Sequence, residues 1–505
     1  RKIMLSLVPC LAAARPDDVV IVGAGVAGLT TAYRLVQSGV PGPSITLIEQ
    51  RAASGGRVKN HAVRGFAGKH VEVGGTWIGS TQYRVAALAR ELGLSPDAGD
   101  FFHTYYNLAP PLGPSAFLTD DGEACAPRHG AWPTAGQPAC TEVAPVPSDR
   151  QLALLRRLRG MAAHVGVASP WESSLARLDN VTVLEWLRSE GLADKELVGF
   201  LDQIVAIPLS TDISKISMLF YLFFESSCPS LSDAFFIGGA QDYRFTAGSE
   251  RLPDLLRQNV SRAGVRFLWN TTVRHIANEP AGVRLVVGPT AGSIDRREST
   301  LDASHAVVAM GTGDAARLEY SGITAMRQRL HADWVQEKGG LKFFLVYETA
   351  FWRPPFTSAP RNIPAFDIAT NSLLFFDYSD QTGVPGILAG FFTSTSGTPK
   401  EREALLASTV CLGSNLAGMN QSCSHVGYYE QRWDLSHPRG GTSNIVQYMP
   451  PGVLTTAGAA WRAPIGRLHW AGSDTAQEWM GYIDGAVESG NRAATEVVQA
   501  LLRDL

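Results

Sequence analysis

Residues 17–39, DDVVIVGAGVAGLTTAYRLVQSG, decide the fold. The apolar run at 19–22 has the length and β-branched composition of a buried strand. It leads into the motif Gly23-Ala-Gly25-Val-Ala-Gly28, which is followed by apolar residues spaced along one face of a helix. Gly23 permits a tight turn, Gly25 lets the backbone approach a pyrophosphate, and Gly28 allows strand and helix to pack closely. The stretch therefore predicts a strand, a phosphate-binding turn and a helix.

A second strand follows in SITLIEQ and ends at Glu49. The amino end of the intervening helix faces the phosphate charge, and Glu49 is placed to accept hydrogen bonds from an adenosine ribose. A lone glycine motif is weak, but strand, helix, strand and terminal acid together predict a dinucleotide-binding α/β fold. The strands belong to a parallel, doubly wound sheet with helices on its faces.

The next segment, QRAASGGRVKN, adds Gly55, Gly56 and Arg57 directly after the second strand. A nicotinamide enzyme has no need of this extra motif. The sequence here resembles the large FAD-dependent oxidoreductases, in which a second glycine motif and an arginine contact the pyrophosphate of the flavin.

Two further segments narrow the resemblance. VEVGGTWIGSTQYRVAALARELGL at 71–94 and LHWAGSDTAQEWMGYIDGAVESGNRAATEVV at 468–498 resemble the flavin amine oxidases, in particular their monoamine oxidase branch. In the second segment a strand delivers Gly472 and Ser473, and a small-residue helix then points its positive end at the isoalloxazine. The resemblance implies FAD as the cofactor and these cofactor-binding residues: Gly23, Gly25, Ala27, Gly28, Glu49, Arg51, Gly56, Arg57, Gly75, Thr76, Val273, Trp433, Gly472, Ser473, Gly481, Tyr482 and Ile483.

Lys342 stands inside an apolar, strand-like run, GGLKFFLVYET at 339–349. The pattern alone leaves two interpretations open: a lysine that reaches out to solvent, or a buried functional lysine. The resemblance implies that Lys342 lies below flavin N5, holds a water there and assists the reoxidation of reduced flavin by O2. Burial should then depress its pKa.

The family places two aromatic rings around the substrate amine. Tyr482 matches one of these positions, whereas this chain carries Ser443 at the other. The preceding Thr442 matches the cysteine that binds FAD covalently in animal monoamine oxidases, so we expect non-covalent FAD. The catalytic candidates are thus Lys342 and Tyr482. The substrate-pocket candidates are Gln241, Phe375, Phe376 and Ser443, with Phe235 and Phe236 as further apolar walls.

The motif order predicts an interleaved architecture. The FAD-binding domain comprises 16–98, 244–330 and 436–505, and an α+β substrate domain with a mixed or antiparallel sheet comprises 99–243 and 331–435. A Pro- and Ala-rich insertion falls within 105–160. The segment AGVRFLWNTTVRHI at 263–276 predicts a strand pair, and SMLFYLFFES predicts a core helix.

The composition of the chain indicates which classes of binding partner to expect. Hydrophobic residues make up 45% of the 505 residues, charged residues 18%, and the net charge is −3, so nucleic acid is not expected. No apolar span is long enough for a transmembrane anchor. We expect a small amine and O2 as partners, and a homodimer remains open. The six cysteines show no metal-ligand spacing; Cys125 with Cys140 and Cys411 with Cys423 can form local disulfides, leaving Cys10 and Cys228.

Residues 1–15 have the layout of a secretory signal peptide, with a basic start, an apolar stretch and an Ala-x-Ala ending. A buried N-terminal element is the alternative. Four Asn-x-Ser/Thr sequons, at Asn180, Asn259, Asn270 and Asn420, favour a secreted or vesicular glycoprotein over a soluble intracellular protein.

The leading functional hypothesis is an FAD-dependent amine oxidase that converts a primary or secondary amine to an imine and O2 to H2O2. Alternatives in the superfamily are an L-amino-acid oxidase, a polyamine oxidase and a biosynthetic alkaloid-type oxidase. An amino-acid oxidase needs an arginine for the substrate carboxylate, but Trp77 occupies that position and Arg84 lies too far along; Arg244 is the possible substitute. A flavin-binding protein without turnover is the remaining alternative.

Overall fold

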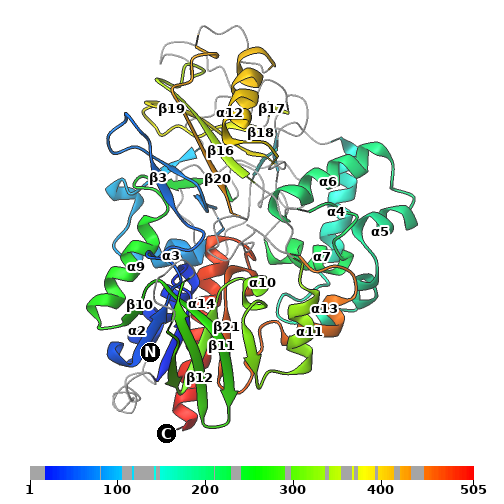
Figure 1. Cartoon of the computed structure of the whole chain (residues 1–505). Coiled ribbons are helices and arrows are strands. Elements are labelled where there is room, and N and C mark those ends of the chain that lie inside the picture. Colours follow the sequence, from blue (N-terminus) through cyan, green and yellow to red (C-terminus); the bar gives the residue numbers. More distant parts are fainter. Residues whose placement is uncertain are drawn as a thin grey trace.

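The computed structural model describes most of the chain (Figure 1). The described residues are 18–79, 81–104, 116–118, 141–143, 148–209, 211–228, 240–290, 297–335, 341–353, 367–368, 374–392, 396–413, 421–433 and 448–504.

A five-stranded parallel sheet forms the centre of the first region, with the strand order β10-β2-β1-β14-β21. Its strands are β1 (Val19–Val22), β2 (Ile45–Ile48), β10 (Arg266–Leu268), β14 (His305–Ala309) and β21 (Leu468–Ala471). The predicted parallel α/β sheet is confirmed, and the strand at 19–22 has the predicted bounds.

The two faces of this sheet are covered differently. Val19 and Ile21 point to the helices α2 (Val26–Gln37), α9 (Arg251–Arg262) and α14 (Ile483–Asp504). Val20 and Val22 point instead to a second, four-stranded sheet. That sheet has the order β13-β12-β11-β15, with β11 (Thr271–Glu279), β12 (Gly282–Pro289), β13 (Ser299–Ala303) and β15 (Glu319–Ser321). The expectation of helices on both faces is corrected: one face carries a sheet, because β11 and β12 supply apolar side chains of their own.

A five-stranded antiparallel sheet lies at the top of Figure 1. Its order is β17-β18-β19-β16-β20, with β16 (Leu341–Tyr347), β17 (Asp367–Ile368), β18 (Leu374–Asp377), β19 (Gly386–Phe392) and β20 (Gly427–Arg432). Strand β16 pairs with β19 on one side and with β20 on the other, so every one of its residues is buried. The predicted strand around Lys342 is confirmed.

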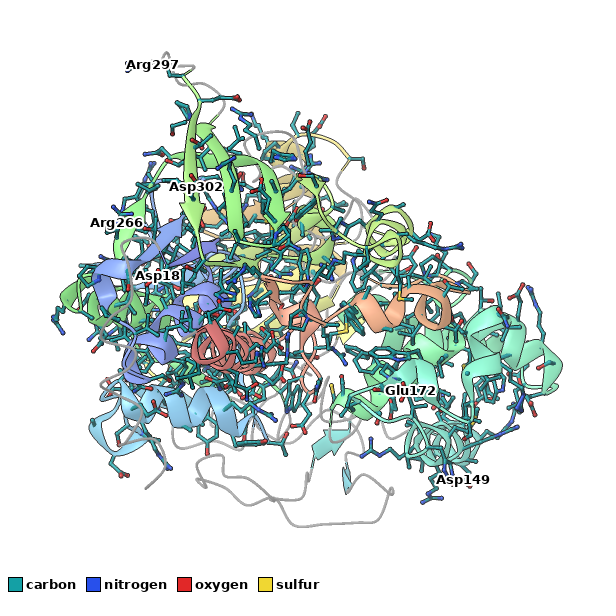
Figure 2. The ribbon with its side chains drawn as sticks, turned by 90° about the horizontal axis from the view of Figure 1, so that it is seen from below. Asp18, Asp149, Glu172, Arg266, Arg297 and Asp302 are labelled. Atoms are coloured by element: carbon teal, nitrogen blue, oxygen red, sulfur yellow. A yellow bond between two sulfur atoms is a disulfide. The ribbon has the colours of Figure 1, made fainter. Side chains whose placement is uncertain are left out.

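A group of helices packs beside the two sheet regions, around α7. Figure 2 shows this group, marked by Asp149 and Glu172, on the opposite side from Asp302 of β13. Residues 218–225 of α7 are all buried, as predicted for a core helix. The group consists of α4 (Asp149–Ala162), α5 (Val183–Ser189), α6 (Lys195–Leu209), α7 (Met218–Ser227), α11 (Ala325–Asp333) and α13 (Val453–Ala457).

The remaining elements connect these regions. Strands β5 (Trp77–Ile78), β9 (Tyr243–Phe245) and β6 (Phe101–His103) form a small sheet, β3 (Asn60–Ala62) pairs with β4 (His70–Glu72), and β7 (Ala116–Leu118) pairs with β8 (Thr141–Val143). The other helices are α3 (Tyr83–Glu91), α10 (Thr312–Ala315) and α12 (Pro399–Ser408).

The strand pair predicted for 263–276 is corrected. Its two strands, β10 and β11, do not pair with each other: β10 joins β2 in the parallel sheet, and β11 pairs with β12. The left-handed backbone at Asn270, with φ 53°, redirects the chain between the two sheets instead of closing a hairpin.

One of the two candidate disulfides is present, between Cys411 and Cys423. Cys228 is a buried thiol, and Cys10, Cys125 and Cys140 lie outside the described residues. Among the helices that the structure describes, none is both long enough and apolar enough to cross a membrane.

Candidate active site

Two glycines of the turn after β1 have no room for a side chain. A Cβ at Gly23 would lie 2.5 Å from the Ala309 carbonyl oxygen, and a Cβ at Gly28 would lie 2.0 Å from the Gly23 oxygen. Helix α2 starts directly after Gly25, which has no side chain to cap the helix. The helix therefore presents its first N–H groups and a positive dipole end at this turn, which suits the pyrophosphate of FAD.

Glu49 ties the end of β2 to this turn. Its carboxylate accepts hydrogen bonds from the backbone N–H of Ala24 (2.9 Å) and of Arg51 (3.0 Å), and its side chain is buried. Its backbone carbonyl accepts from Thr271 N–H at the start of β11, the strand that carries Val273. Glu49, Arg51 and Val273 are thereby brought to one end of the glycine turn.

The second glycine motif joins the two ends of the chain. Arg57 Nη2 donates to Ser473 Oγ at 2.9 Å, and a Cβ at Gly56 would lie 3.1 Å from Gly25 Cα. Gly472, with φ 133°, has no room for a Cβ, which would meet the Met310 carbonyl oxygen at 2.5 Å. The three glycine segments that the sequence predicts for FAD thus lie side by side.

The segment 72–76 lies between the start of α14 and the sheet of β16. A Cβ at Gly75 would lie 3.3 Å from Ile483, and one at Gly74 would lie 3.0 Å from the Trp433 ring. Trp433 is buried, and its Nε1 donates to the Val73 carbonyl oxygen at 3.1 Å. The candidates Gly75, Trp433 and Ile483 are therefore close neighbours.

Lys342 reaches this segment from β16. Its ammonium donates to the carbonyl oxygens of Glu72 (2.8 Å) and Gly74 (3.1 Å) and to Thr76 Oγ1 (2.6 Å). Only 1% of Lys342 is exposed, which settles the two sequence interpretations in favour of the buried lysine. Burial lowers its pKa from 10.5 to about 7, against the opposing charge of Glu72.

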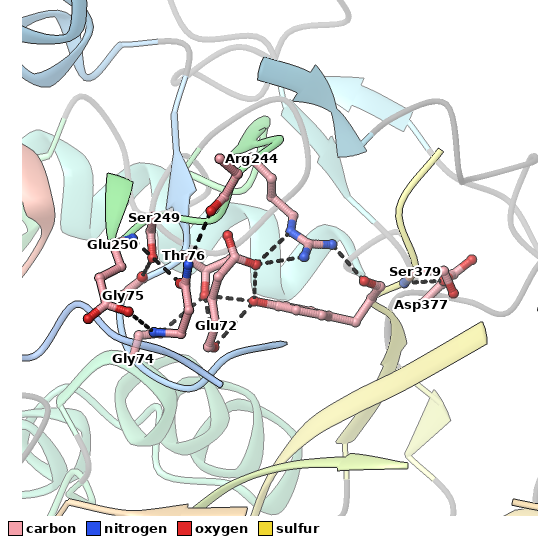
Figure 3. Close-up of polar contacts among 12 residues, drawn as sticks. Glu72, Gly74, Gly75, Thr76, Arg244, Ser249, Glu250, Asp377 and Ser379 are labelled. Atoms are coloured by element: carbon pink, nitrogen blue, oxygen red, sulfur yellow. Dashed lines mark hydrogen bonds and ion pairs between the residues drawn. The ribbon is translucent and has the colours of Figure 1, made fainter. Parts of the chain in front are cut away.

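A buried ion pair supports the same segment. Arg244 donates twice to Glu72 Oε2, at 2.6 and 3.2 Å, and once to the Tyr378 carbonyl oxygen (Figure 3). The Tyr378 hydroxyl contacts Glu72 Oε2 at 2.7 Å and Thr76 Oγ1 at 3.0 Å. Burial raises the pKa of Tyr378 above its usual range, so this phenol stays protonated.

Aromatic rings enclose the Lys342 ammonium. The ring of Trp77 lies 4.9 Å from Nζ, that of Tyr378 5.0 Å and that of Phe391 5.9 Å. Phe376 packs against Trp77 at 5.5 Å between ring centroids, and both side chains are partly exposed. These rings provide an apolar wall next to the lysine.

For the other candidate site residues the structure describes only some of the side-chain positions. Tyr482 is partly exposed and packs edge-on against Trp479, which is buried in the helical core. Gln241 precedes β9, and its backbone carbonyl accepts from the Thr104 hydroxyl. Phe375 lies in β18, but its side chain is not among the described ones. The whole of each of four further candidates lies outside the described residues: Phe235, Phe236, Thr442 and Ser443.

Sequence reasoning missed Glu72 and Tyr378, and it considered Arg244 only as a carboxylate ligand. The signal for Glu72 was present, since it is a lone acid between two valines, Val71 and Val73. Tyr378 gave no signal, because it is one of several aromatic residues in LLFFDYSD. No group of three or more His, Cys, Asp or Glu side chains suited to a metal occurs in the described part of the chain.

The comparisons with known proteins agree with this geometry. Residues 26–498 match the family model described as flavin containing amine oxidoreductase. A putative flavin-containing monoamine oxidase, AofH, of Mycobacterium tuberculosis is 29% identical over 499 residues, covering 96% of this chain and 97% of the relative. Amine oxidase [flavin-containing] A of Bos taurus is 26% identical, covering 96% and 85% respectively.

Solved structures share the fold over the same length. Cyclohexylamine oxidase from Brevibacterium oxydans has a TM-score of 0.76 at 25% identity and covers 97% of this chain and 100% of its own. Putrescine oxidase bound to putrescine has a TM-score of 0.74 at 23% identity, with coverages of 96% and 99%, which shows the fold alone.

Proposed function

The chain belongs to the family of flavin-containing amine oxidoreductases, which are FAD-dependent enzymes, and on this premise we propose that its substrate is an apolar primary or secondary amine. The enzyme oxidises the amine to an imine and reduces O2 to H2O2; water then converts the imine to an aldehyde. FAD supplies the redox chemistry, and the protein positions the amine and stabilises charge.

The observation that carries the substrate proposal is the pairing of the two candidate arginines. Arg244 is held by Glu72 within the protein interior, and Arg84 pairs with Glu478 at 2.7 Å and with Asp484 at 3.4 Å. Releasing either guanidinium for a substrate carboxylate would leave a buried carboxylate uncompensated. This disfavours an L-amino-acid oxidase, and the apolar wall of Trp77 and Phe376 favours an apolar amine.

We propose that FAD is bound by the glycine turns at 23–28 and 55–57, by Glu49, and by the segment 472–483, without a covalent bond. The support is the absence of room for a Cβ at Gly23, Gly28 and Gly55 and the bond between Arg57 and Ser473. Thr442 has no thiol for a thioether. Guanidinium denaturation followed by ultrafiltration should release all the flavin; flavin retained with the polypeptide would contradict non-covalent binding.

We propose that Lys342 assists the reduction of O2 and that Tyr482 orients the substrate amine. A buried cation next to the flavin stabilises the negative charge that develops as O2 accepts electrons. Lys342→Met should keep FAD bound and slow reoxidation by O2 about 100-fold in stopped-flow experiments. The exposed Lys400→Met is the matched control. Reoxidation of Lys342→Met at the wild-type rate would contradict this role.

The function is tested with a substrate panel. Purified enzyme is mixed with apolar monoamines, diamines and L-amino acids, and H2O2 release is recorded. Apolar primary or secondary amines should give the highest kcat/KM. Turnover only with L-amino acids or diamines would contradict the substrate proposal, and bound FAD without peroxide from any amine would point to a flavoprotein without this activity.

The domain division stays a proposal with structural support. All five strands of the parallel sheet come from 16–98, 244–330 and 436–505, and the antiparallel sheet around β16 comes from 331–435.

We also propose that the protein is secreted or located in vesicles. The disulfide Cys411–Cys423 is typical of oxidising compartments, and the sequon residues Asn180 and Asn270 are exposed. Glycosidase treatment of protein from the native source should lower its apparent mass.

A further inference from the structure

The contacts of Lys342 continue into a chain of hydrogen bonds. Its ammonium has three N–H groups, which donate to Thr76 Oγ1 and to two backbone carbonyl oxygens. Tyr378 has one hydroxyl hydrogen, and its shortest acceptor is the carboxylate Glu72 Oε2 at 2.7 Å. Tyr378 Oη is then left as an acceptor for the Thr76 hydroxyl at 3.0 Å. The Thr76 hydroxyl also lies 3.1 Å from the Gly74 carbonyl oxygen, so its hydrogen has two acceptors within 3.1 Å; when it points to Tyr378, the bonds run in one direction, from Lys342 through Thr76 and Tyr378 to Glu72.

We propose that Lys342, Thr76, Tyr378 and Glu72 form a proton relay that holds one proton between the two half-reactions, with Tyr378 as the positioning residue that orients the Thr76 hydroxyl. The proposal rests on the proposed role of Lys342. Each hop moves one hydrogen along an existing bond: from Lys342 Nζ to Thr76, from Thr76 to Tyr378, and from Tyr378 to Glu72 Oε2. The outcome is a neutral amine and a neutral carboxylic acid, with the number of protons and the total charge unchanged; the neutral amine then takes up the proton that the substrate releases and returns it when O2 is reduced.

The overall reaction needs one such proton. An alkylammonium substrate, R–CH2–NH3+, becomes R–CH=NH2+ by giving up one hydride to the flavin and one proton. O2 becomes H2O2 by taking two electrons, the proton delivered with the hydride, and one further proton. The proton released in the first half-reaction therefore equals the one consumed in the second, and a buried group that takes it up and returns it keeps the site balanced.

The charges of the cluster make Lys342 the group that exchanges this proton. Before the hop Arg244 and Glu72 compensate each other and a protonated Lys342 is the uncompensated charge; after it Lys342 is neutral and Arg244 carries the uncompensated charge. On the flanking strands Lys342 faces Phe391 and Gln431, neither of which titrates. Its lowered pKa of about 7 agrees with a proton that is held but readily released.

Burial is the reason that a relay is needed. Lys342, Tyr378, Thr76 and Glu72 are each at most 2% exposed, so none of them exchanges protons with bulk water directly. Glu72 Oε1 accepts no hydrogen bond from any residue that the structure describes, so the carboxyl group keeps a free acceptor oxygen when Oε2 holds the proton. The relay thus connects the lysine to a second site that can store one.

The main test variant is Tyr378→Phe, which removes the hydroxyl and keeps the ring. Tyr347→Phe is the matched control, since Tyr347 is also buried in the same sheet but its hydroxyl faces the Ser422 carbonyl. Flavin content and circular dichroism report folding. Stopped-flow reoxidation is measured in H2O and D2O between pH 6 and pH 9. A pH titration of the flavin absorbance of the oxidised resting enzyme reports the ionisation of Lys342.

The wild type should show a solvent isotope effect on reoxidation with a curved dependence on the D2O fraction, because several protons move together. Tyr378→Phe should slow reoxidation at least tenfold and make this dependence linear, while the absorbance titration moves little. Glu72→Gln, a second variant of similar shape, removes the compensating charge and should shift the titration to lower pH by about one unit.

The outcomes separate the relay from the role of Lys342. If Lys342→Met and Tyr378→Phe both slow reoxidation, the relay is supported. If Lys342→Met slows it but Tyr378→Phe matches Tyr347→Phe in rate and isotope effect, the relay is refuted while the lysine role stands. If Lys342→Met reoxidises at the wild-type rate, both are refuted. Should Tyr378→Phe not fold, Thr76→Val interrupts the same chain and is judged by the same isotope effect.

Discussion

The buried ammonium of Lys342 should make the stability of the protein rise with pH, and Lys342→Met should remove that rise. Its pKa is lowered from 10.5 to about 7 in the folded state by burial. Because the folded pKa lies below the unfolded one, the unfolded chain binds more protons between these values. Stability therefore increases as pH rises from 7 towards 10.5.

The magnitude follows from the same two values. One pKa unit corresponds to about 1.4 kcal/mol, so the difference amounts to about 5 kcal/mol over the full range. Between pH 7 and pH 9 linkage gives about 2 kcal/mol, because Lys342 is already half deprotonated at pH 7. With an unfolding entropy of about 2 cal/mol/K per residue over 505 residues, this corresponds to about 2 °C in Tm.

The assay compares thermal unfolding of wild type, Lys342→Met and Lys400→Met at pH 7, 8 and 9 with one scan rate and one ionic strength. The measured quantity is the change in Tm from pH 7 to pH 9 in each protein. Wild type and Lys400→Met should gain about 2 °C more than Lys342→Met. An equal gain in all three proteins would refute the reasoning, because Lys342 would then keep its usual pKa in the folded state.

Three further predictions concern stability elsewhere in the chain. Replacing Cys411 and Cys423 by Ser should lower the free energy of unfolding by about 3 kcal/mol, since the disulfide closes a loop with a sequence separation of 12; urea titration measures it, and no change would contradict it. Burial raises the pKa of Asp484 to about 6, so wild type should lose stability as pH rises from 4 to 6, and Asp484→Asn should flatten that Tm profile. Gly490→Ala should cost about 1–3 kcal/mol and lower the FAD content, because its Cβ would lie 2.6 Å from the Ala27 carbonyl oxygen; unchanged Tm and FAD content would contradict it.

The sequence predicted best those segments of the fold whose structure depends on residues close together in the chain. Gly23 and Gly28 stand where a Cβ would collide with backbone, so their spacing, together with the flanking strands and Glu49, identifies the turn and the helix. Strand β16 is recognisable from its own composition. Whether Lys342 was buried could not be read locally, because that depends on pairing with two distant strands, β19 and β20.

Contacts between residues far apart in the chain were the main part of the site that the sequence could not predict. Glu72, Arg244 and Tyr378 meet through strands that are far apart in the chain, and no pattern within any one strand indicates a partner in another. The strand pair expected at 263–276 was wrong for a related reason. Both strands form, but the choice of sheet for each strand was made by partners elsewhere, β2 and β12.

The position of β21 and α14 has a consequence for how the protein is made. Strand β21 completes the edge of the parallel sheet beside β14, and α14 packs against α2 close to the glycine turn. About 450 residues separate β1 from β21, which at 5–20 residues per second is roughly 20 to 90 s of synthesis. During that time the nascent chain lacks the edge strand β21 and the helix α14. The parallel sheet and the proposed FAD site are therefore completed only after nearly the whole chain has been synthesised.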